Sequence, residues 1–478
     1  MFKKLIFSFF FLTQLHGTIS LNQTETYSPI YPESGLPFRV QIEQASFSLP
    51  AGVHSYARGV YNGKWLILAG RTNGMHSFND NNDNFPPSQQ NTLVFVVDPI
   101  NQTVVTKDLT DPTSGLTQTQ IDSLSVTSPQ AYYKKNTLYM TGGYGVDTAT
   151  GQFSTKSFLT AINIPGLMHW VESPSEGETA AQHIRQISDP FLQVTGGQMF
   201  EIENGLTLLV FGQNFIGYYT ETEDGNFTSG NYTNQVRRFQ IVDNGTTLKI
   251  KLKGFYPEKN NPNFRRRDLN VVPMISMKWG KEVQYLCAYS GVFTIPGGIW
   301  TIPVTIASDG FTHMNSPSNS KAFMQSMNNY DSANAGLFSK KNDMMYTVLL
   351  GGLTYGYYLN GVFMVDEEIP FTNEVTTVNL DKHGNFKQYL MSGQYPVIPS
   401  TGSNPGNTLL FGAGAEFFLA NNVSAYSNHV VKLDDLKSTT QIGYIVGGIM
   451  STVPNTNFST DSTASPYIFK VSIIPVTN

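Results

Sequence analysis

The sequence predicts an all-β protein folded as a β-propeller, and three observations lead to this fold class. Six strand-like apolar runs each end at a glycine. A tight polar turn precedes most of these runs, and a long loop and further strand-like segments follow them, which makes about four strands per unit. The composition, with 13% aromatic and 14% charged residues, 42 Gly and 25 Pro, suits many strands and turns. We therefore predict six blades of four antiparallel strands.

The repeated element is clearest in NTLYMTGGYG, residues 136–145, where a short strand stops at Gly142 and Gly143. The glycines that end the six runs are Gly70, Gly143, Gly212, Gly291, Gly352 and Gly448. They lie 61 to 96 residues apart, a distance that fits a small sheet better than the shorter period of a helical repeat.

The last unit lacks a fourth strand, because the chain ends soon after PYIFKVSIIP, residues 466–475. Near the other end, FRVQIEQASFSL alternates apolar and polar side chains over residues 38–49 and has no local partner. We expect this segment to close the last blade, which would remove two open sheet edges. The predicted blades span about 50–112, 128–174, 190–256, 268–314, 331–392 and 405–478.

The glycine pairs resemble the mark of the kelch family of β-propellers, in which Gly-Gly closes the second strand of each blade. Gly142-Gly143, Gly351-Gly352 and Gly447-Gly448 match this mark, and the other three units carry one glycine. The resemblance implies a fold related to the central propeller of galactose oxidase. It implies no single activity, since kelch-like propellers include binding scaffolds and enzymes. The histidines, tyrosines and cysteine of a galactose-oxidase-like copper site find no match in this chain.

The N-terminus predicts export. Lys3 and Lys4 precede an apolar run from Leu5 to Leu15, and small or polar residues follow, so residues 1–20 are typical of a signal peptide. We expect residues 21–478 to form one monomeric propeller domain, secreted or in the cell envelope, with no membrane span. The net charge of −5 and the scattered basic residues give no reason to expect nucleic-acid binding. The single cysteine, Cys287, lies in the apolar run YLCAY and is expected to be buried.

Loop lengths predict two unequal faces. The turns between first and second strands and between third and fourth strands read as short, whereas the other connections are long, so we expect function on the long-loop face. Residues that enter each first strand should surround the central channel there. The tentative ligand-binding residues are His54, Arg58, Arg71, Asp189, Arg267, Asp268, Asn270 and Asp331. Their arginines and carboxylates suit a carbohydrate or small anion, although such residues in propellers also bond only water and loop backbone.

Other loop residues allow two further expectations. Asp80 and Asp83 in NDNNDN could offer oxygen ligands to Ca²⁺, but the loop lacks the spacing and closing Glu of an EF-hand, so no cofactor is predicted. Aromatic residues in FIGYY and TYGYY, residues 215–219 and 354–358, suit either a binding surface or packing between blades.

The sequence thus predicts a secreted propeller that binds an extracellular carbohydrate or protein on its long-loop face. Two alternatives stay open: a glycan-acting enzyme at the channel mouth, with Arg71, Arg267, Asp268 and His54 as its polar groups, or a structural or adhesion component of the cell surface. The sequence assigns no catalytic residue.

Overall fold

The computed structural model describes residues 27–77, 84–202, 205–219, 230–292, 294, 298–359, 362–456, 458 and 460–476. The predicted signal peptide and the loop residues Asp80 and Asp83 lie outside these ranges.

The repeated glycines are explained by backbone conformation and by lack of space. Each of the six has a positive φ, from +80° at Gly143 to +104° at Gly291, and the residue before each is also left-handed. A Cβ on Gly143 would lie 2.4 Å from Cγ2 of Val126, in the segment that leads into the innermost strand of the same sheet. The Gly143 amide donates to the carbonyl of Val194, which leads into the sheet after that one, at 2.9 Å. The glycine therefore ends a strand and ties it to the next sheet.

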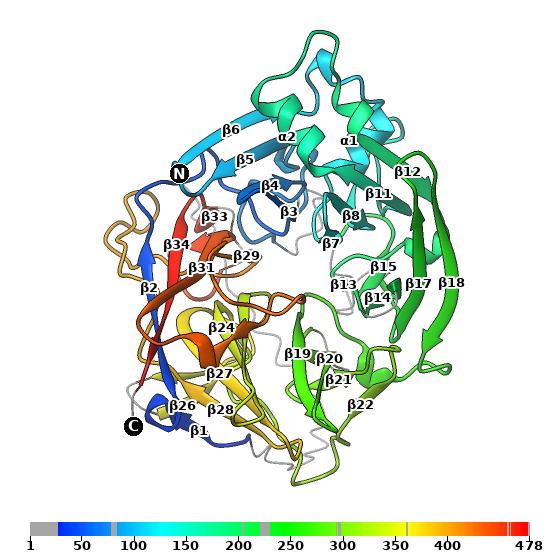
Figure 1. Ribbon diagram of the computed structural model, residues 1–478. Helices are drawn as coiled ribbons and strands as arrows, with labels where there is room; N and C mark the ends of the chain where they lie inside the picture. Colours follow the sequence, from blue (N-terminus) through cyan, green and yellow to red (C-terminus); the bar gives the residue numbers. More distant parts are fainter. Residues whose placement is uncertain are drawn as a thin grey trace, which may run out of the picture.

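Within the described residues, the main β-structure comprises five four-stranded sheets and one six-stranded sheet, arranged radially around one axis (Figure 1). From the axis outward, the first sheet has the order β3 (Ala57–Tyr61), β4 (Lys64–Leu68), β5 (Leu93–Asp98) and β6 (Thr103–Asp108), and the second has the order β7 (Gln130–Lys134), β8 (Thr137–Thr141), β11 (Phe158–Asn163) and β12 (Ile184–Ser188). The third sheet has the order β13 (Gln198–Glu201), β14 (Thr207–Val210), β17 (Val236–Asp243) and β18 (Leu248–Tyr256). The fourth sheet has the order β19 (Asn270–Lys278), β20 (Lys281–Tyr289), β21 (Val304–Ile306) and β22 (Thr312–Met314). The four-stranded antiparallel propeller architecture predicted from the sequence is confirmed for these sheets.

The fifth sheet is larger than predicted. Its antiparallel strands are β23 (Ala333–Ser339), β24 (Met344–Leu353), β27 (Phe371–Asp381) and β28 (Phe386–Leu390). Two short parallel strands extend it at its edges: β1 (Ile30–Pro32) pairs with β28, and β30 (Val431–Lys432) pairs with β23. Both additions come from distant parts of the chain, so sequence-local patterns could not reveal them.

The last sheet is closed by the N-terminal strand, as the sequence predicted. It contains β29 (Ala415–Leu419), β31 (Thr440–Gly447), β34 (Ile468–Pro475) and β2 (Phe38–Gln44). β2 pairs antiparallel with β34, with Phe38 opposite Pro475 and Gln44 opposite Phe469. The first and last sheets pack together through Trp65 and Phe418, whose rings stack at 4.6 Å. This contact closes the ring of sheets without a covalent link.

The connections carry further elements. Two-stranded ribbons project from the connections between second and third strands: β9 (Tyr144–Asp147) with β10 (Gln152–Thr155), β15 (Gln213–Phe215) with β16 (Gly230–Tyr232), β25 (Gly356–Leu359) with β26 (Val362–Val365), and β32 (Ile449–Ser451) with β33 (Ser462–Ala464). Within the described ranges, the 3-10 helices are η1 (Glu33–Gly35), η2 (Pro87–Gln89), η3 (Pro112–Ser114), η4 (Ala180–His183), η5 (Pro190–Leu192), η7 (Pro262–Phe264) and η8 (Leu433–Asp435). The α-helices are α1 (Gln118–Leu124) and α2 (Ile164–Glu172).

Helix α2 corrects the predicted second blade. The predicted second blade ends at residue 174, but after β11 the chain forms this helix and reaches the fourth strand, β12, only at Ile184. Asn163 caps the helix by accepting a hydrogen bond from the Gly166 amide at 3.0 Å. Ile164, Leu167, Met168 and Val171 are buried at helical spacing, which explains why their apolar pattern is not a strand pattern. The second sheet therefore extends to Ser188, beyond the predicted boundary at 174.

None of the described helices is long and apolar enough to cross a membrane.

Candidate functional site

One residue with a left-handed backbone stands just before the innermost strand of each sheet. These residues are Ser55, Ser128, Gly196, Asp268, Asp331 and Gly414, with φ between +47° and +66°. In the described part of the chain, five backbone hydrogen bonds of 2.7–3.2 Å link them in sequence around the axis: Ser55 donates to Gly414, Ser128 to Ser55, Gly196 to Ser128, Asp268 to Gly196, and Gly414 to Asp331. We call this ring the axial belt. It places side chains from different sheets around one opening.

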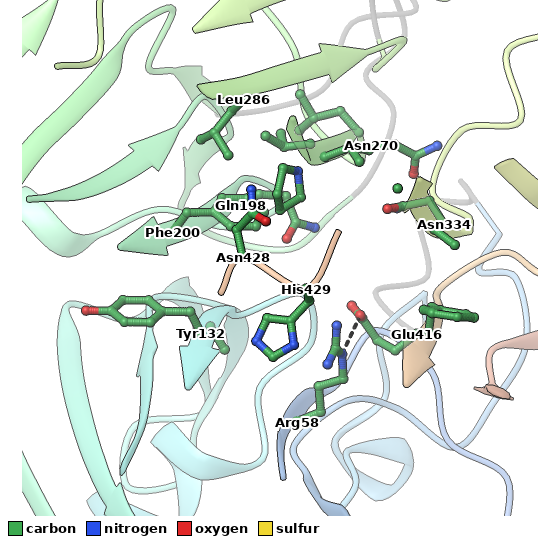
Figure 2. Close-up of a pocket in the computed structure, with 18 of the residues that line it drawn as sticks. Arg58, Tyr132, Gln198, Phe200, Asn270, Leu286, Asn334, Glu416, Asn428 and His429 are labelled. Carbon is green, nitrogen blue, oxygen red and sulfur yellow. Dashed lines mark hydrogen bonds and ion pairs between the residues drawn. The ribbon is translucent and has the colours of Figure 1, made fainter. Parts of the chain in front are cut away.

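The innermost strands and the belt line a cavity of about 600 Å³ on the propeller axis, here called the central chamber. Strands β3, β7, β13, β19, β23 and β29 all contribute side chains to it (Figure 2). Its polar lining includes Arg58, Gln198, Asn334, Glu416, Asn428 and His429, and Tyr132, Phe200 and Leu286 supply apolar surface. A volume of this size is typical of a small-molecule site.

A long insertion in the last sheet bounds the chamber on the face opposite the belt. It connects β29 to β31 and spans residues 420–439, where the repeat pattern predicted a short turn. The hydroxyl of Ser427 accepts a hydrogen bond from Gln284 of the fourth sheet at 2.9 Å, and the His429 ring lies 5.3 Å from the Tyr133 ring of the second sheet. The insertion therefore crosses the axis and brings Asn428 and His429 to the chamber wall. The insertion and α2 both replace turns that were predicted to be short, so this face also carries long connections.

The chamber is electrostatically uneven. Arg58 donates from Nε to the Glu416 carboxylate at 2.9 Å, and its guanidinium lies 5.1 Å from the centre of the Phe418 ring. Burial alone would lower the pKa of Arg58, but the neighbouring Glu416 raises it above its ordinary value. Burial lowers the pKa of His429 to about 4, with Arg58 adding to the effect, so this imidazole is neutral at pH 7. One side of the chamber thus holds a fixed ion pair beside a neutral imidazole.

Two carboxylates of the belt stand on the fourth and fifth sheets. Burial raises the pKa of Asp268, opposed by Arg267, whose Nε lies 3.6 Å from the Asp268 carboxylate. Burial also raises the pKa of Asp331 well above its ordinary value, and the neighbouring Asp268 and Glu416 raise it further. Among the described residues, no lysine, arginine or histidine nitrogen lies within 4 Å of the Asp331 carboxylate. The Asp331 carboxyl group can therefore hydrogen-bond a ligand in the chamber. It donates a proton when protonated and accepts a hydrogen bond when ionised.

Two of the three predicted arginines, Arg71 and Arg267, lie in a separate buried cluster near the belt rather than in the chamber. Arg71 is 1% exposed; it donates to Asn73 Oδ1 at 2.9 Å and to the Pro86 carbonyl at 3.1 Å, and lies 4.8 Å from the Phe85 ring centre. Arg267 donates to the Tyr219 hydroxyl. Arg71 therefore holds together the long loop of the first sheet, and Arg267 joins the entry of the fourth sheet to the long loop of the third.

Two histidines complete this cluster. His54 pairs with Arg71 through backbone hydrogen bonds of 3.1 Å in both directions. Burial, then Arg71 and His76, lower the pKa of His54 to about 3; burial, then Arg267 and Arg71, lower the pKa of His76 to about 4. Both imidazoles are therefore neutral at pH 7, which lets them pack beside two arginines.

The structure thus divides the predicted ligand-binding residues into three groups. Arg58, Asp268, Asn270 and Asp331 line the chamber, whereas His54, Arg71 and Arg267 belong to the buried cluster. Asp189 is at neither place: it accepts a hydrogen bond from the Phe191 amide at 2.8 Å and caps η5 between the second and third sheets. The sequence placed Asp189 at a first strand because α2 was not recognised.

Several chamber residues were not predicted from the sequence. They are Gln198, Asn334, Glu416, Asn428 and His429. One signal for the insertion was present, because the 96 residues between Gly352 and Gly448 form the longest of the repeat spacings. The aromatic loop residues Phe215 and Tyr219 are buried against Tyr144 and Phe153, so at these positions the packing interpretation is confirmed.

Asn270 has a structural role within the lining. Its Nδ2 donates to the Asn329 carbonyl at 2.7 Å, and its Oδ1 accepts from the Ser332 amide at 3.0 Å. The amide therefore ties the fourth sheet to the fifth, and little of its hydrogen-bonding capacity is left for a ligand.

Comparison with known proteins identifies no family. No protein-family model matches the chain, and no curated protein matches it. Among solved structures, one described as "Structure of YjhT" matches with 12% sequence identity, covering 89% of this chain and 98% of that chain, with a TM-score of 0.45. The assignment of the propeller fold here rests on the sheets and their arrangement.

Proposed function

We propose that this protein is a secreted binding protein that holds a carbohydrate in its central chamber. The observation that carries the proposal is the combination of a cavity of about 600 Å³ with amide, carboxylate and aromatic side chains from all the surrounding sheets. Sugars present many hydroxyl groups that both donate and accept hydrogen bonds, and amides and carboxylates complement them.

Several polar groups of the chamber have capacity for a ligand. No hydrogen bond of the Gln198 side chain occurs among the described residues, and Asn334 uses only Nδ2, in a bond of 3.3 Å to the Ser332 carbonyl. The imidazole of His429 contacts Tyr133 through its ring, and its neutral state leaves one nitrogen as donor and the other as acceptor. These groups come from three sheets and can contact different hydroxyls of one sugar.

The chamber favours a small ligand over a protein. The ligand-facing groups lie on the propeller axis, between the axial belt and the insertion 420–439, rather than on an outer surface. A protein could reach them only with a single side chain or an extended end. The proposal therefore places the sugar deeper than the long-loop surface that the sequence suggested.

To test this proposal, the purified mature protein would be screened on a glycan array and the hits measured by calorimetry. We expect the variants Gln198→Ala and Asn334→Ala each to weaken binding by about fivefold to tenfold, the effect of one lost hydrogen bond. Asn315→Ala is the matched control, because Asn315 is exposed and lies outside the chamber. Chamber variants that bind like the wild type would place the site elsewhere, and a folded protein that binds no glycan would favour the structural or adhesion role.

One observation favours a second candidate, a glycan-acting enzyme. Asp331, with its raised pKa, stands near Asp268 and Glu416, and glycoside hydrolysis uses one protonated and one ionised carboxyl group. His54, Arg71 and Arg267 do not line the chamber and have no part in this version. We expect Asp331→Asn to abolish hydrolysis of a bound glycan while binding persists. An absence of hydrolysis in the wild type would leave the binding role alone.

We further propose that the six-stranded sheet is a sixth blade, made of β23, β24, β27 and β28 with two added edge strands, and that the propeller is kelch-like. In support, the axial belt places one equivalent residue before the innermost strand of this sheet as before those of the others. Export would be tested by expressing the full chain and sequencing the N-terminus of the mature protein. We expect cleavage near residue 20.

A further inference from the structure

The turn between β19 and β20 carries the most exposed large apolar side chain of the described residues. Trp279 is 98% exposed at the tip of this hairpin, on the short-turn face of the propeller. The chain has four tryptophans, of which Trp65 and Trp170 are fully buried. An indole left wholly in water loses the burial that usually stabilises it.

The backbone at Trp279 makes this placement costlier. Trp279 and Gly280 have φ of +50° and +74°, the pattern of a two-residue hairpin turn in which Asn-Gly is favoured. The first sheet uses that pair: Asn62 and Gly63 have φ of +48° and +80° in the same turn. Asn tolerates the left-handed region far better than Trp does. The fourth sheet therefore replaces a favourable turn residue by one that suffers strain and exposure, and folding gives no reason for the exchange.

Exposed lysines lie at this turn and at the corresponding turn of the next sheet. Lys278 and Lys281 flank the turn, and Lys340 and Lys341 form the corresponding turn of the next sheet; all four are exposed. An ion pair of 3.0 Å between Lys340 and Glu282 brings the two turns together. Trp279 and these four lysines are here called the Trp279 corner.

Three carboxylates lie near the Trp279 corner, and one of them forms an ion pair. Glu282 pairs with Lys340, Asp343 accepts from the Met277 amide at 3.0 Å, and Asp434 accepts from the Lys341 amide at 2.9 Å. Among the described residues, no carboxylate lies within 4 Å of the ammonium groups of Lys278, Lys281 and Lys341. Lys278, Lys281 and Lys341 therefore make no ion pair, and they outnumber Asp343 and Asp434, whose charges also remain, so the corner keeps a small positive excess.

We propose that the Trp279 corner docks on the surface of an anionic lipid bilayer. An indole is typical of the headgroup layer, where its apolar ring and its N–H both find favourable surroundings. Lysines beside it are attracted to anionic lipids and can extend their ammonium groups toward the phosphates. The proposal is independent of the chamber, because this hairpin tip does not line it.

Such a contact would orient the propeller. The Trp279 corner is on the short-turn face, so a bilayer below it leaves the long-loop face and the axial belt directed away from the lipid. One indole and a few lysines give weak, reversible and salt-sensitive binding, in the range of a peripheral protein.

The test is sedimentation of the mature protein with vesicles of phosphatidylcholine alone or of equal parts phosphatidylcholine and phosphatidylglycerol. We expect binding to the anionic vesicles that weakens as salt rises, with a blue shift of tryptophan fluorescence. Trp279→Asn, which restores the residue used in the first sheet, should weaken binding by on the order of tenfold. Lys278→Gln and Lys281→Gln should each weaken it by about fivefold.

The Trp279→Asn variant should be at least as stable as the wild type in urea. A loss of vesicle binding in this variant therefore could not be attributed to misfolding. Val397→Asn is the control: Val397 is 79% exposed between the fifth and last sheets, away from the Trp279 corner. The proposal is overturned if Trp279→Asn binds vesicles like the wild type, if neutral vesicles bind equally well, or if only an acidic protein and no vesicle is bound.

Discussion

Gly143→Ala tests whether the repeated glycines are required by conformation, by space, or by both. The residue has φ of +80°, where an L-residue costs about 1–2 kcal/mol. An added Cβ would lie 2.4 Å from Val126 Cγ2, 2.8 Å from Val126 Cβ and 3.1 Å from the Thr127 carbonyl oxygen. Val126 is fully buried in the segment that leads into β7 of the same sheet, so the overlap can be relieved only by moving closely packed atoms, at about 1–3 kcal/mol. Together, Gly143→Ala should destabilise the fold by about 2–5 kcal/mol.

Gly151→Ala separates the two causes. Gly151 is also left-handed, with φ of +69°, but nothing lies within 4 Å of a Cβ built there. This control should therefore cost only about 1–2 kcal/mol, the conformational part. Urea unfolding followed by tryptophan fluorescence would give both values. Equal losses for the two variants would refute the argument from space, and a loss in neither would refute the argument from conformation as well.

Three further outcomes follow from charges and burial. Arg58→Met should destabilise the fold by about 1–3 kcal/mol, because it leaves Glu416 without its partner. Adding Glu416→Gln to the same chain should restore part of this loss. If the changes in unfolding free energy of the two single variants simply add in the double variant, the pair is not coupled. His429 should titrate near pH 4 by NMR. Its pKa in the folded protein is below the ordinary 6.5, so its contribution to stability is present above pH 6.5 and is lost as the pH falls toward 4. A titration midpoint near 6.5 would contradict the burial argument. Cys287, fully buried and with its pKa raised to about 12, should resist iodoacetamide at pH 8 until the protein is unfolded; rapid labelling of the native protein would contradict this.

The sequence allowed the propeller to be predicted because its main signal is local. A strand followed by two left-handed residues requires glycine at the second position in all six cases and tolerates Ala69, Phe211 or Ser290 at the first in three of them. Ring closure by residues 38–44 was also predictable, because an alternating strand without a partner matched a sheet that lacked one. Both inferences needed only periodicity and the avoidance of open sheet edges.

The chamber could not be predicted in the same way, because its contacts join distant parts of the chain. Arg58 and Glu416 are separated by 358 residues and neither belongs to a motif. His429 reaches the axis only because a 20-residue insertion crosses from the last sheet to the second. Asp189 was wrongly assigned to the channel. The repeat pattern placed it at the start of a first strand, but α2 lengthens the second sheet, so that Asp189 instead caps η5 after the last strand of that sheet.

The axial belt explains how a near-symmetric fold produces an asymmetric site. All six belt positions require a left-handed residue whose amide or carbonyl joins the belt. Gly196 and Gly414 adopt this conformation at the least conformational cost. Asp268 and Asp331 meet it at a cost of roughly 1 kcal/mol each, and they are adjacent in the ring. Their carboxylates therefore gather on the fourth and fifth sheets, while Arg58 and Glu416 lie on the first and last. A ligand in the chamber meets two chemically different walls, which would fix its orientation, and exchanging Asp331 for glycine should weaken that preference without opening the belt.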